Sequence, residues 1–331
     1  MASKKKITII TPSYNQGQFI EQTIDSVLSQ NYASLEYIIV DGGSTDNTVE
    51  IIKKHEKHLA YWVSEPDKGQ SDAINKGLKR ATGDIVNWLN SDDYYEPDTL
   101  HKVSDAFADD NTNVLCGKSR LFKGDATVKH SRGTDIYDDN LAKTIGWARI
   151  DQPETFFRKS VIDQIGSVNP ALHYVMDKEW WVRYLLAFGL SGIRKIDEVL
   201  VNFRLHESSK TISQSGGFEA ETDALYFNLA QQMGFEKEAA AIQTVTDGLK
   251  ENYPLTFQQP KVDKESVLAA LHYYLLYKAD LFYYRHQRKL SKLCLQSINK
   301  QLLKEEDRQL FNKLRFRNKV LPTSLVKLLR K

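Results

Sequence analysis

The sequence predicts an α/β protein with a mostly parallel central sheet, helices on both faces of that sheet, and a C-terminal helical extension. Runs rich in β-branched residues alternate four times with segments of helical periodicity over about the first hundred residues. Such alternation requires crossover connections, which favour parallel strands covered on both faces. After Gly216-Gly217 the chain is dominated by helix formers. We therefore expect an α/β domain over residues 1–216 and a helical extension over residues 217–331.

Each predicted strand is a short apolar run that ends in polar residues or glycine. Between the first two runs, Phe19, Ile20, Ile24 and Val27 recur at helical spacing, and the later intervals carry similar patterns. The first strand should end at Thr11-Pro12. The predicted strands contain the runs ITII (7–10), LEYIIV (35–40), LAYWV (59–63) and DIVNWL (84–89).

Polar clusters follow the ends of all four predicted strands. In a parallel sheet, ligands bind beyond the carboxyl ends of the strands. We therefore expect these clusters to converge on one edge of the sheet. They are Tyr14-Asn15, Asp41-Gly42-Gly43, the segment 65–68 and Ser91-Asp92-Asp93.

Composition and charge narrow the class of protein. The chain has 331 residues and a formal net charge of +2, so its bulk charge gives no reason to expect nucleic-acid binding. Its two cysteines, Cys116 and Cys294, are far apart, which favours reduced thiols over a disulfide or a metal site. No apolar run reaches the roughly 18–20 residues that span a bilayer. We expect a cytoplasmic protein, or one that touches a membrane from the cytoplasmic side.

Several common catalytic motifs are absent from the sequence. No Gly-x-Gly-x-x-Gly follows the first predicted strand, and no glycine-rich loop ends in Gly-Lys-Ser/Thr. The sequence also contains no Cys/His cluster of zinc-binding spacing and no Gly-x-Ser-x-Gly elbow. The remaining chemistry-bearing groups are carboxylates.

The adjacent pair Asp92-Asp93 closes the stretch NWLNSDD. Two neighbouring carboxylates raise each other's pKa unless a positive group compensates them. Mg²⁺ and Mn²⁺ prefer such oxygen ligands and complete their shell with phosphate oxygens and water. The alternative is that one of the two carboxylates caps the next helix, near Pro97-Asp98.

Asp41 is the second carboxylate that could bind a ligand. It directly follows the apolar run YIIV, and the two glycines after it allow a close approach of the backbone. Its carboxylate could accept hydrogen bonds from a base or a ribose. The alternative is an ordinary turn that begins with an aspartate.

The stretches ITIITPSYNQGQFIEQTIDSVLSQNYASLEYIIVDGGSTDNT and SEPDKGQSDAINKGLKRATGDIVNWLNSDD closely resemble the family 2 glycosyltransferases, whose fold is called GT-A. The resemblance covers roughly residues 5–215. It implies sugar transfer from a nucleotide-activated donor, with a divalent cation (Mn²⁺ or Mg²⁺) and inversion at the anomeric carbon. By this resemblance, Pro12 and Tyr14 border the base, Asp41 binds it, Asp93 is the direct metal ligand, and Asp92 contacts the ribose or a metal-bound water.

One position departs from the family pattern. Many relatives carry an arginine before the residue that corresponds to Asn75, whereas this chain has Ile74. A phosphate or base contact would then come from elsewhere. Lys68 is the candidate for that contact, and Asp67 for a sugar or base contact.

An inverting single displacement needs a base that takes the proton of the acceptor hydroxyl. In the resembling family this base is the Asp six residues before the Arg of the helix, which gives Asp177, counted back from Arg183. Glu179 is the alternative. Gln152 and Glu154 match a segment that lies beneath the acceptor.

The motif VNFRLHESSKT resembles the closing motif of the family. It offers His206 as a second metal ligand or a diphosphate contact. Arg204 or Lys210 could neutralise the leaving group.

The C-terminal segment combines basic and apolar residues. From residue 313 to residue 331 it contains Lys and Arg but no Asp or Glu. This pattern indicates either an interfacial helix on an anionic membrane or a helical packing surface, including a homodimer contact.

We expect an enzyme that transfers a sugar from a nucleoside diphosphate sugar, a UDP-sugar by default, to a hydroxyl of a glycan or lipid-linked acceptor during cell-surface polysaccharide synthesis. The alternatives are a non-catalytic nucleotide-sugar-binding protein and a nucleotidyltransferase. The nucleotidyltransferase would need basic residues in its first loop, and TPSYNQGQ has none.

Overall fold

The computed structural model describes residues 5–147, 149–207, 209, 215–246, 249 and 261–320. The described residues divide into a sheet unit (5–135, 149–207, 209 and 215) and a helical unit (136–147, 216–246, 249 and 261–320). Residues 136–147 fall inside the predicted α/β domain but group with the helices. The domain boundary at 216/217 stays a prediction. Lys210 and the segment 321–331 lie outside the described residues.

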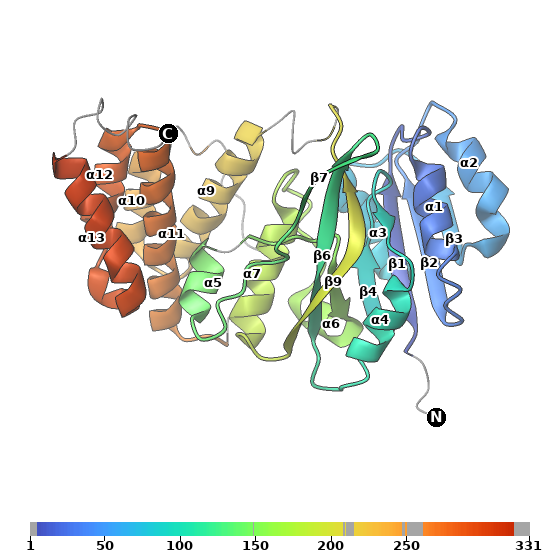
Figure 1. Cartoon of the computed structure of the whole chain (residues 1–331), viewed down its shortest axis with the longest axis horizontal. Helices are drawn as coiled ribbons and strands as arrows, with labels where there is room; N and C mark the ends of the chain where they lie inside the picture. The colour runs from blue at the N-terminus through green and yellow to red at the C-terminus, as the bar shows by residue number, and fades with distance from the viewer. Residues whose placement is uncertain are drawn as a thin grey trace. The chain divides into compact units, whose positions relative to one another are not determined.

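The strands of the described sheet unit form one sheet in the order β3-β2-β1-β4-β8-β6-β9-β5, with β7 paired to β6 (Figure 1). The four predicted strands are parallel neighbours, while β8 runs antiparallel to both β4 and β6. The predicted α/β class with a parallel core is confirmed. The strands are β1 (Ile7–Ser13), β2 (Leu35–Asp41), β3 (Tyr61–Ser64), β4 (Ile85–Trp88), β5 (Tyr94–Tyr95), β6 (Val114–Lys123), β7 (Ala126–His130), β8 (Thr155–Arg158) and β9 (Ile193–Arg204).

Helices cover both faces of the parallel strands. Ile7 and Ile9 of β1 belong to one buried cluster with Ile20 and Ile24 of α1. Ile10, which points to the opposite face, meets α3 so closely that a Cβ at Gly77 would lie 2.4 Å from Ile10 Cγ2. The helices of this unit are α1 (Ile20–Leu28), α2 (Thr48–His55), η1 (Glu56–His58), α3 (Gln70–Arg80), α4 (Thr99–Ala106), α6 (Lys159–Ile165) and α7 (Met176–Phe188).

Strand β1 runs beyond the end that its proline predicts. Pro12 is buried within β1, opposite Val40 of β2, and the strand continues to Ser13. Ile85 N and Leu89 N donate to the carbonyl oxygens of Lys6 and Ile10, so the backbone groups of these two residues face β4. Every second residue of a strand faces the same neighbour, so the nitrogen of Pro12 also points toward β4. Strand β4 pairs with β1 only as far as Ile10, so no ladder bond is lost at the proline.

The helical unit is built around the long helix α11, which packs against α5, α12 and α13 (Figure 1). Its Lys278 is buried and paired with Asp223 (2.9 Å) and Glu219 (3.0 Å) of α9. A buried ammonium needs such partners, because an unpaired charge in a helical core is costly. The helices of the unit are α5 (Leu141–Trp147), α9 (Ser215–Gln232), α10 (Glu236–Val245), α11 (Lys264–Tyr284), α12 (Arg288–Ser297), η2 (Lys300–Leu302) and α13 (Glu305–Val320).

Neither cysteine forms a disulfide, and burial raises the pKa of both the Cys116 and the Cys294 thiol to about 12. Among the described residues, none of the helices has the length and apolarity to cross a bilayer.

Candidate active site

The three outer parallel strands end in one row of polar side chains. Ser13 of β1 lies opposite Asp41 of β2, which lies opposite Ser64 of β3. The buried Asp41 carboxylate accepts hydrogen bonds from Gly43 N (3.1 Å), Ser44 N (2.8 Å) and Ser64 Oγ (2.6 Å). These donors hold the carboxylate in one orientation at the predicted edge. The second oxygen, Oδ1, accepts from Ser44 Oγ, and a carboxylate oxygen has two lone pairs. Oδ1 can therefore accept one further bond, so the geometry is compatible with the predicted contact to a base.

The loops after these strands lie against one another. A Cβ at Gly42 would be 2.8 Å from Asp67 Oδ2, so glycine lets the loop after β2 approach the loop after β3. Asn15 N donates to Ser44 Oγ (2.7 Å), and Thr45 N donates to Asn15 Oδ1 (2.8 Å), which joins the loops after β1 and β2. The predicted base-bordering residue Tyr14, next to Asn15, is 59% exposed.

The predicted phosphate contact Lys68 and Ile74, the position that departs from the family pattern, have different surroundings. Lys68 is exposed, and its backbone N–H donates to Asp72 Oδ2 (3.2 Å). Ile74 is fully buried in α3, so the position that is an arginine in many relatives belongs to the core here. Its neighbour Asn75 bonds the backbone of Val168 in both directions, at 2.9 and 3.0 Å.

Asp93 is buried almost completely behind the end of β4. Its Oδ1 accepts from Arg204 N (2.9 Å), whereas Oδ2 is buried without a hydrogen-bond partner. Burial, reinforced by the charge of Asp92, holds the pKa of Asp93 well above its usual range. Asp98, rather than either carboxylate of the pair, precedes α4 as its cap residue.

Two basic side chains beside the carboxylate pair, Arg204 and His206, come from the end of β9 and the residues after it. His206 Nε2 lies 2.9 Å from Asp92 Oδ2, and Arg204 Nε donates to the Asp92 carbonyl (2.9 Å). The Arg204 guanidinium also lies over the rings of Phe19 and Phe122, each 4.7 Å from the ring centroid. Arg204 and His206 are more than 110 residues from Asp92 in sequence, and only the fold brings them together.

The carboxylate pair fits the divalent cation that the family resemblance implies, although with few protein ligands. Among the residues that the structure describes, there is no group of three or more His, Cys, Asp or Glu side chains that could hold a metal ion. Asp93 Oδ2 is nevertheless a buried hard oxygen without a donor. This suits a cation that takes one or two protein carboxylates and completes its shell with phosphate and water. His206 faces Asp92 instead, so its role as a metal ligand stays a prediction.

The two candidate bases on α7 have different surroundings. Asp177 lies in the first turn, is half-buried, and accepts from Lys178 N (2.7 Å). Burial raises the pKa of Asp177 to about 6, and the charge of Asp151 contributes in the same direction. Glu179 is fully buried and paired with Arg183, whose Nη2 also donates to Ser167 O (2.7 Å). Glu179 therefore anchors α7, while Asp177 is the less buried of the two residues.

Gln152 and Glu154 are both buried. Gln152 Nε2 donates to Asn87 Oδ1 (2.7 Å) and Trp88 O (2.9 Å). Glu154 Oε1 accepts from Ser131 Oγ (2.9 Å), and its Oε2 has no partner. Burial, followed by the charge of Asp151, raises the pKa of Glu154 to about 8.

Sequence reasoning missed Asp151. Its charge raises the pKa of both Glu154 and Asp177, and the charge of Glu154 in turn raises that of Asp93. These interactions connect the four carboxyl groups electrostatically. The only available signal was the acidic spacing in DQPE, which does not distinguish a site residue from a surface one.

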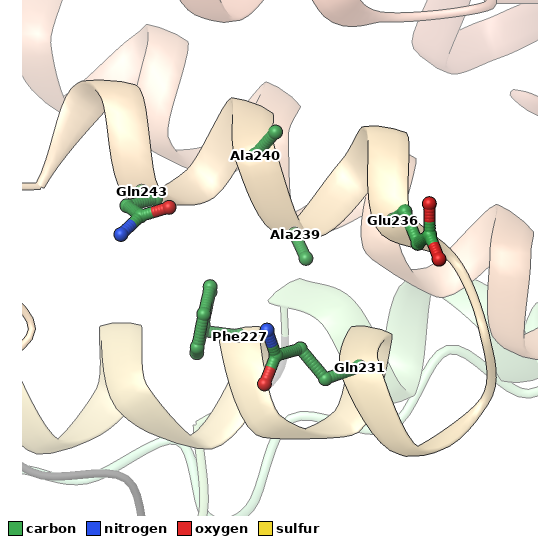
Figure 2. A pocket seen from close by; sticks show the side chains of 6 residues that line it. All are labelled: Phe227, Gln231, Glu236, Ala239, Ala240 and Gln243. Carbon is green, nitrogen blue, oxygen red and sulfur yellow. The ribbon is translucent and has the colours of Figure 1, made fainter.

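A hollow of about 360 Å³ lies between α9 and α10 of the helical unit (Figure 2). Its lining combines apolar side chains with amide and carboxylate groups, and it contains none of the predicted site residues. It is lined by Phe227, Gln231, Glu236, Ala239, Ala240 and Gln243.

Comparison with known proteins supports the enzyme class that this sheet and its carboxylate edge suggest. The sequence profile of glycosyl transferase family 2 matches residues 8–166. An uncharacterised glycosyltransferase of Mycobacterium tuberculosis is 31% identical over 194 residues, which cover 56% of this chain and 71% of the relative. The putative teichuronic acid biosynthesis glycosyltransferase TuaG of Bacillus subtilis is 36% identical over 151 residues, covering 43% of this chain and 59% of TuaG.

The fold has a solved counterpart. The crystal structure of S. aureus TarS 1-349 in complex with UDP-GlcNAc superimposes with a TM-score of 0.61 at 17% identity, covering 95% of this chain and 88% of that one. This likeness confirms the GT-A fold. The chain belongs to glycosyl transferase family 2 and is a glycosyltransferase.

Proposed function

We propose that the protein transfers a sugar from a nucleoside diphosphate sugar, by default a UDP-sugar, to a hydroxyl of a glycan or lipid-linked acceptor, with inversion and with a divalent cation. The observation that carries the proposal is Asp93, whose buried Oδ2 lacks a partner beside Asp92. The TarS structure is a complex with UDP-GlcNAc, and the name of TuaG refers to teichuronic acid biosynthesis. The TarS complex supports a UDP-sugar donor, and the name of TuaG supports a role in cell-surface polysaccharide synthesis.

On the donor side, the residues of this chain bind and orient the nucleotide. Asp41, fixed by Ser44 and Ser64, would accept from the base, with Tyr14 beside it. Lys68 would contact phosphate. Asp93, with Asp92 next to it, would hold Mn²⁺ or Mg²⁺, which when bound stabilises the charge that develops on the leaving diphosphate.

On the acceptor side, Asp177 takes the proton of the attacking hydroxyl. The hydroxyl oxygen forms a bond to the anomeric carbon, and the bond from that carbon to the diphosphate oxygen breaks. The electron pair leaves with the nucleoside diphosphate, and the proton stays on an Asp177 oxygen. Because burial raises the pKa of Asp177 to about 6, this carboxylate is ionised at neutral pH and is a better base than an exposed aspartate.

A panel of nucleotide sugars with Mn²⁺ tests the reaction class. We expect slow hydrolysis of the correct donor to the nucleoside diphosphate, and stabilisation by that donor in a thermal-shift screen. Release of pyrophosphate would instead support a nucleotidyltransferase. Tight donor binding without any turnover, with or without acceptor glycans, would support a non-catalytic nucleotide-sugar-binding protein.

The proposed reaction also suggests a place of action. Nucleotide sugars are made in the cytoplasm, and a lipid-linked acceptor would present its sugar at the inner face of the cell membrane. We therefore place the protein in the cytoplasm, with peripheral contact to that membrane or, alternatively, with a homodimer contact through its helical unit.

A further inference from the structure

Helix α13 uses one side to pack within the helical unit. Phe311, Leu314 and Asn318 are buried, and Asn318 Nδ2 donates to Ser291 Oγ of α12 (2.9 Å). Arg288 Nη2 also donates to the carbonyl oxygens of Arg317 (2.8 Å) and Asn318 (2.9 Å). The side that faces α12 is therefore fixed, and the rotation of the helix about its axis is fixed with it.

The opposite side of α13 carries an exposed aromatic ring among cations. Phe316 is 61% exposed, and the side chains of Lys313, Arg315 and Lys319 are exposed as well. Lys313 and Lys319 are each three residues from Phe316, so in an α-helix both neighbour it on the surface. Arg315 is exposed at the edge of this side, because it is rotated about 100° from Phe316 and is the i+4 neighbour of the buried Phe311. We call Lys313, Arg315, Phe316 and Lys319 the α13 outer face.

The α13 outer face has no compensating acid close in sequence. The last acidic residue before it, Asp307, is buried and bonded to Lys143 (2.6 Å) and Tyr273 (2.8 Å). No aspartate or glutamate follows Asp307 up to residue 331. The helix thus has acids only in its first turn, and cations cluster towards its C-terminal half.

We propose that the α13 outer face binds an anionic lipid surface, with Phe316 at the boundary between headgroups and acyl chains and the three cations on the headgroup phosphates. Charge complementarity carries this choice, because each cation near an anionic leaflet adds to affinity and an aromatic ring prefers the interface. A second copy of the chain fits less well. A two-fold symmetric contact brings the same surface of both copies together, and here it would oppose like charges.

This inference rests on the proposed function for its meaning, since a membrane-bound enzyme would meet a lipid-linked acceptor directly. The test measures membrane binding alone. Membrane binding can therefore be absent from a protein that transfers sugar, and a protein that binds membranes can lack sugar transfer, so the two proposals fail separately. Full-length protein is co-sedimented with vesicles of phosphatidylcholine alone and of phosphatidylcholine with phosphatidylglycerol. We expect binding to the anionic vesicles only, weakening as salt is added.

Two triple variants locate the surface. Lys313→Gln, Arg315→Gln and Lys319→Gln together should weaken binding to anionic vesicles on the order of 100-fold, as expected for three interfacial cations. The matched control changes Lys289, Lys292 and Lys300 to Gln, three exposed cations on and after α12, and should stay within a few-fold of wild type. Phe316→Ser, with unchanged charge, should also lose binding.

The proposal is overturned by any of three results. The first is equal loss in both triple variants, which would indicate bulk charge. The second is wild-type binding by the α13 triple variant, which would place the contact elsewhere in the chain. The third is a concentration-dependent dimer in size-exclusion chromatography that the α13 triple variant abolishes, because the outer face would then be a contact between copies.

Discussion

Asp177 is set to change its protonation state near pH 6, because burial of its carboxyl group opposes ionisation. At neutral pH it carries the negative charge that a general base needs. Below pH 6 it holds a proton and cannot accept another. The rate of transfer should therefore fall about tenfold per pH unit below pH 6.

Replacing Asp177 by Asn tests this assignment. The amide keeps the size of the side chain but cannot take the proton, so kcat should fall by ~10²–10⁴ with little change in donor KM. The pH dependence near pH 6 should disappear from the residual rate. Full activity in Asp177→Asn, or an unchanged pH profile, would mean that another group is the base.

Glu154 offers a second residue-scale prediction, on stability. Burial raises its pKa to about 8, so between the ordinary glutamate pKa and pH 8 the folded state binds a proton that the unfolded state has lost. The free energy of unfolding should fall over that range by at most ~1.4 kcal/mol per pH unit from this group. Glu154→Gln removes this titration, so the stability of the variant relative to wild type should rise with pH.

Urea denaturation at pH 5, 6.5 and 8 measures that difference. Asp125→Asn, an exposed carboxylate in the turn between β6 and β7, is a suitable control and should give a difference that is small at every pH. A constant difference between Glu154→Gln and wild type across the three pH values would show that Glu154 is ionised in the folded protein.

At the scale of elements, α3 packs against β1 through a glycine. A Cβ at Gly77 would lie 2.4 Å from Ile10 Cγ2 and 3.1 Å from Cγ1, so Gly77→Ala must push the helix or the isoleucine aside. Alanine favours helices by about 1 kcal/mol over glycine, but overpacking typically costs ~1–3 kcal/mol, so we expect net destabilisation. Gly77→Ala should cost less in an Ile10→Ala background, which lacks both γ carbons, than in the wild type, and denaturant melts of the single and double variants would measure this. Stabilisation by Gly77→Ala alone would contradict this packing.

Helix α7 contains the buried ion pair between Glu179 and Arg183. A Glu179 variant therefore tests whether this residue stabilises the helix or acts as the catalytic base. Glu179→Gln leaves the Arg183 guanidinium buried beside a neutral group, so the variant should be destabilised by a few kcal/mol, up to ~3–5. Its kcat per folded molecule should stay near wild type at a temperature well below its Tm. A large loss of kcat without loss of Tm would instead make Glu179 the base.

At the scale of the whole molecule, the proposed donor site links ligand binding to stability. A ligand at one hundred times its Kd stabilises a protein by about 2.7 kcal/mol, so UDP with Mn²⁺ should raise the Tm measurably. Chelation should remove most of this gain, as should Asp93→Asn. Asp98→Asn is the matched control, because Asp98 is exposed and has a φ of 61°, which asparagine tolerates. Equal stabilisation with chelator and with Mn²⁺ would contradict a metal-dependent site.

The sequence by itself determined the parallel core and the edge at which the site lies. The spacing of apolar residues distinguishes strands from helices, and alternating strands and helices predict a parallel sheet. Because parallel strands run in the same direction, their carboxyl ends lie at the same edge of the sheet, where ligands bind. Asp41, Asp92 and Asp93 were therefore predictable as neighbours of one edge. The end of β1 was not, because a proline stops a strand only where its N–H would have been paired, and at Pro12 the neighbouring strand β4 no longer pairs with β1.

The tertiary structure decided what each carboxylate can do. Whether a group is buried, and which donor reaches it, depends on residues far away in sequence, such as Arg204 for Asp93. The same holds for α13, where the sequence shows a mixture of basic and apolar residues but not the rotation of the helix. Packing of α13 within the helical unit buries Leu314 and leaves Phe316 exposed, because a helix can turn only one side to its neighbours. The spacing of apolar residues is local and can be read from the sequence. The burial of a side chain and the identity of its hydrogen-bond partner depend on residues from distant parts of the chain and exist only in the folded protein.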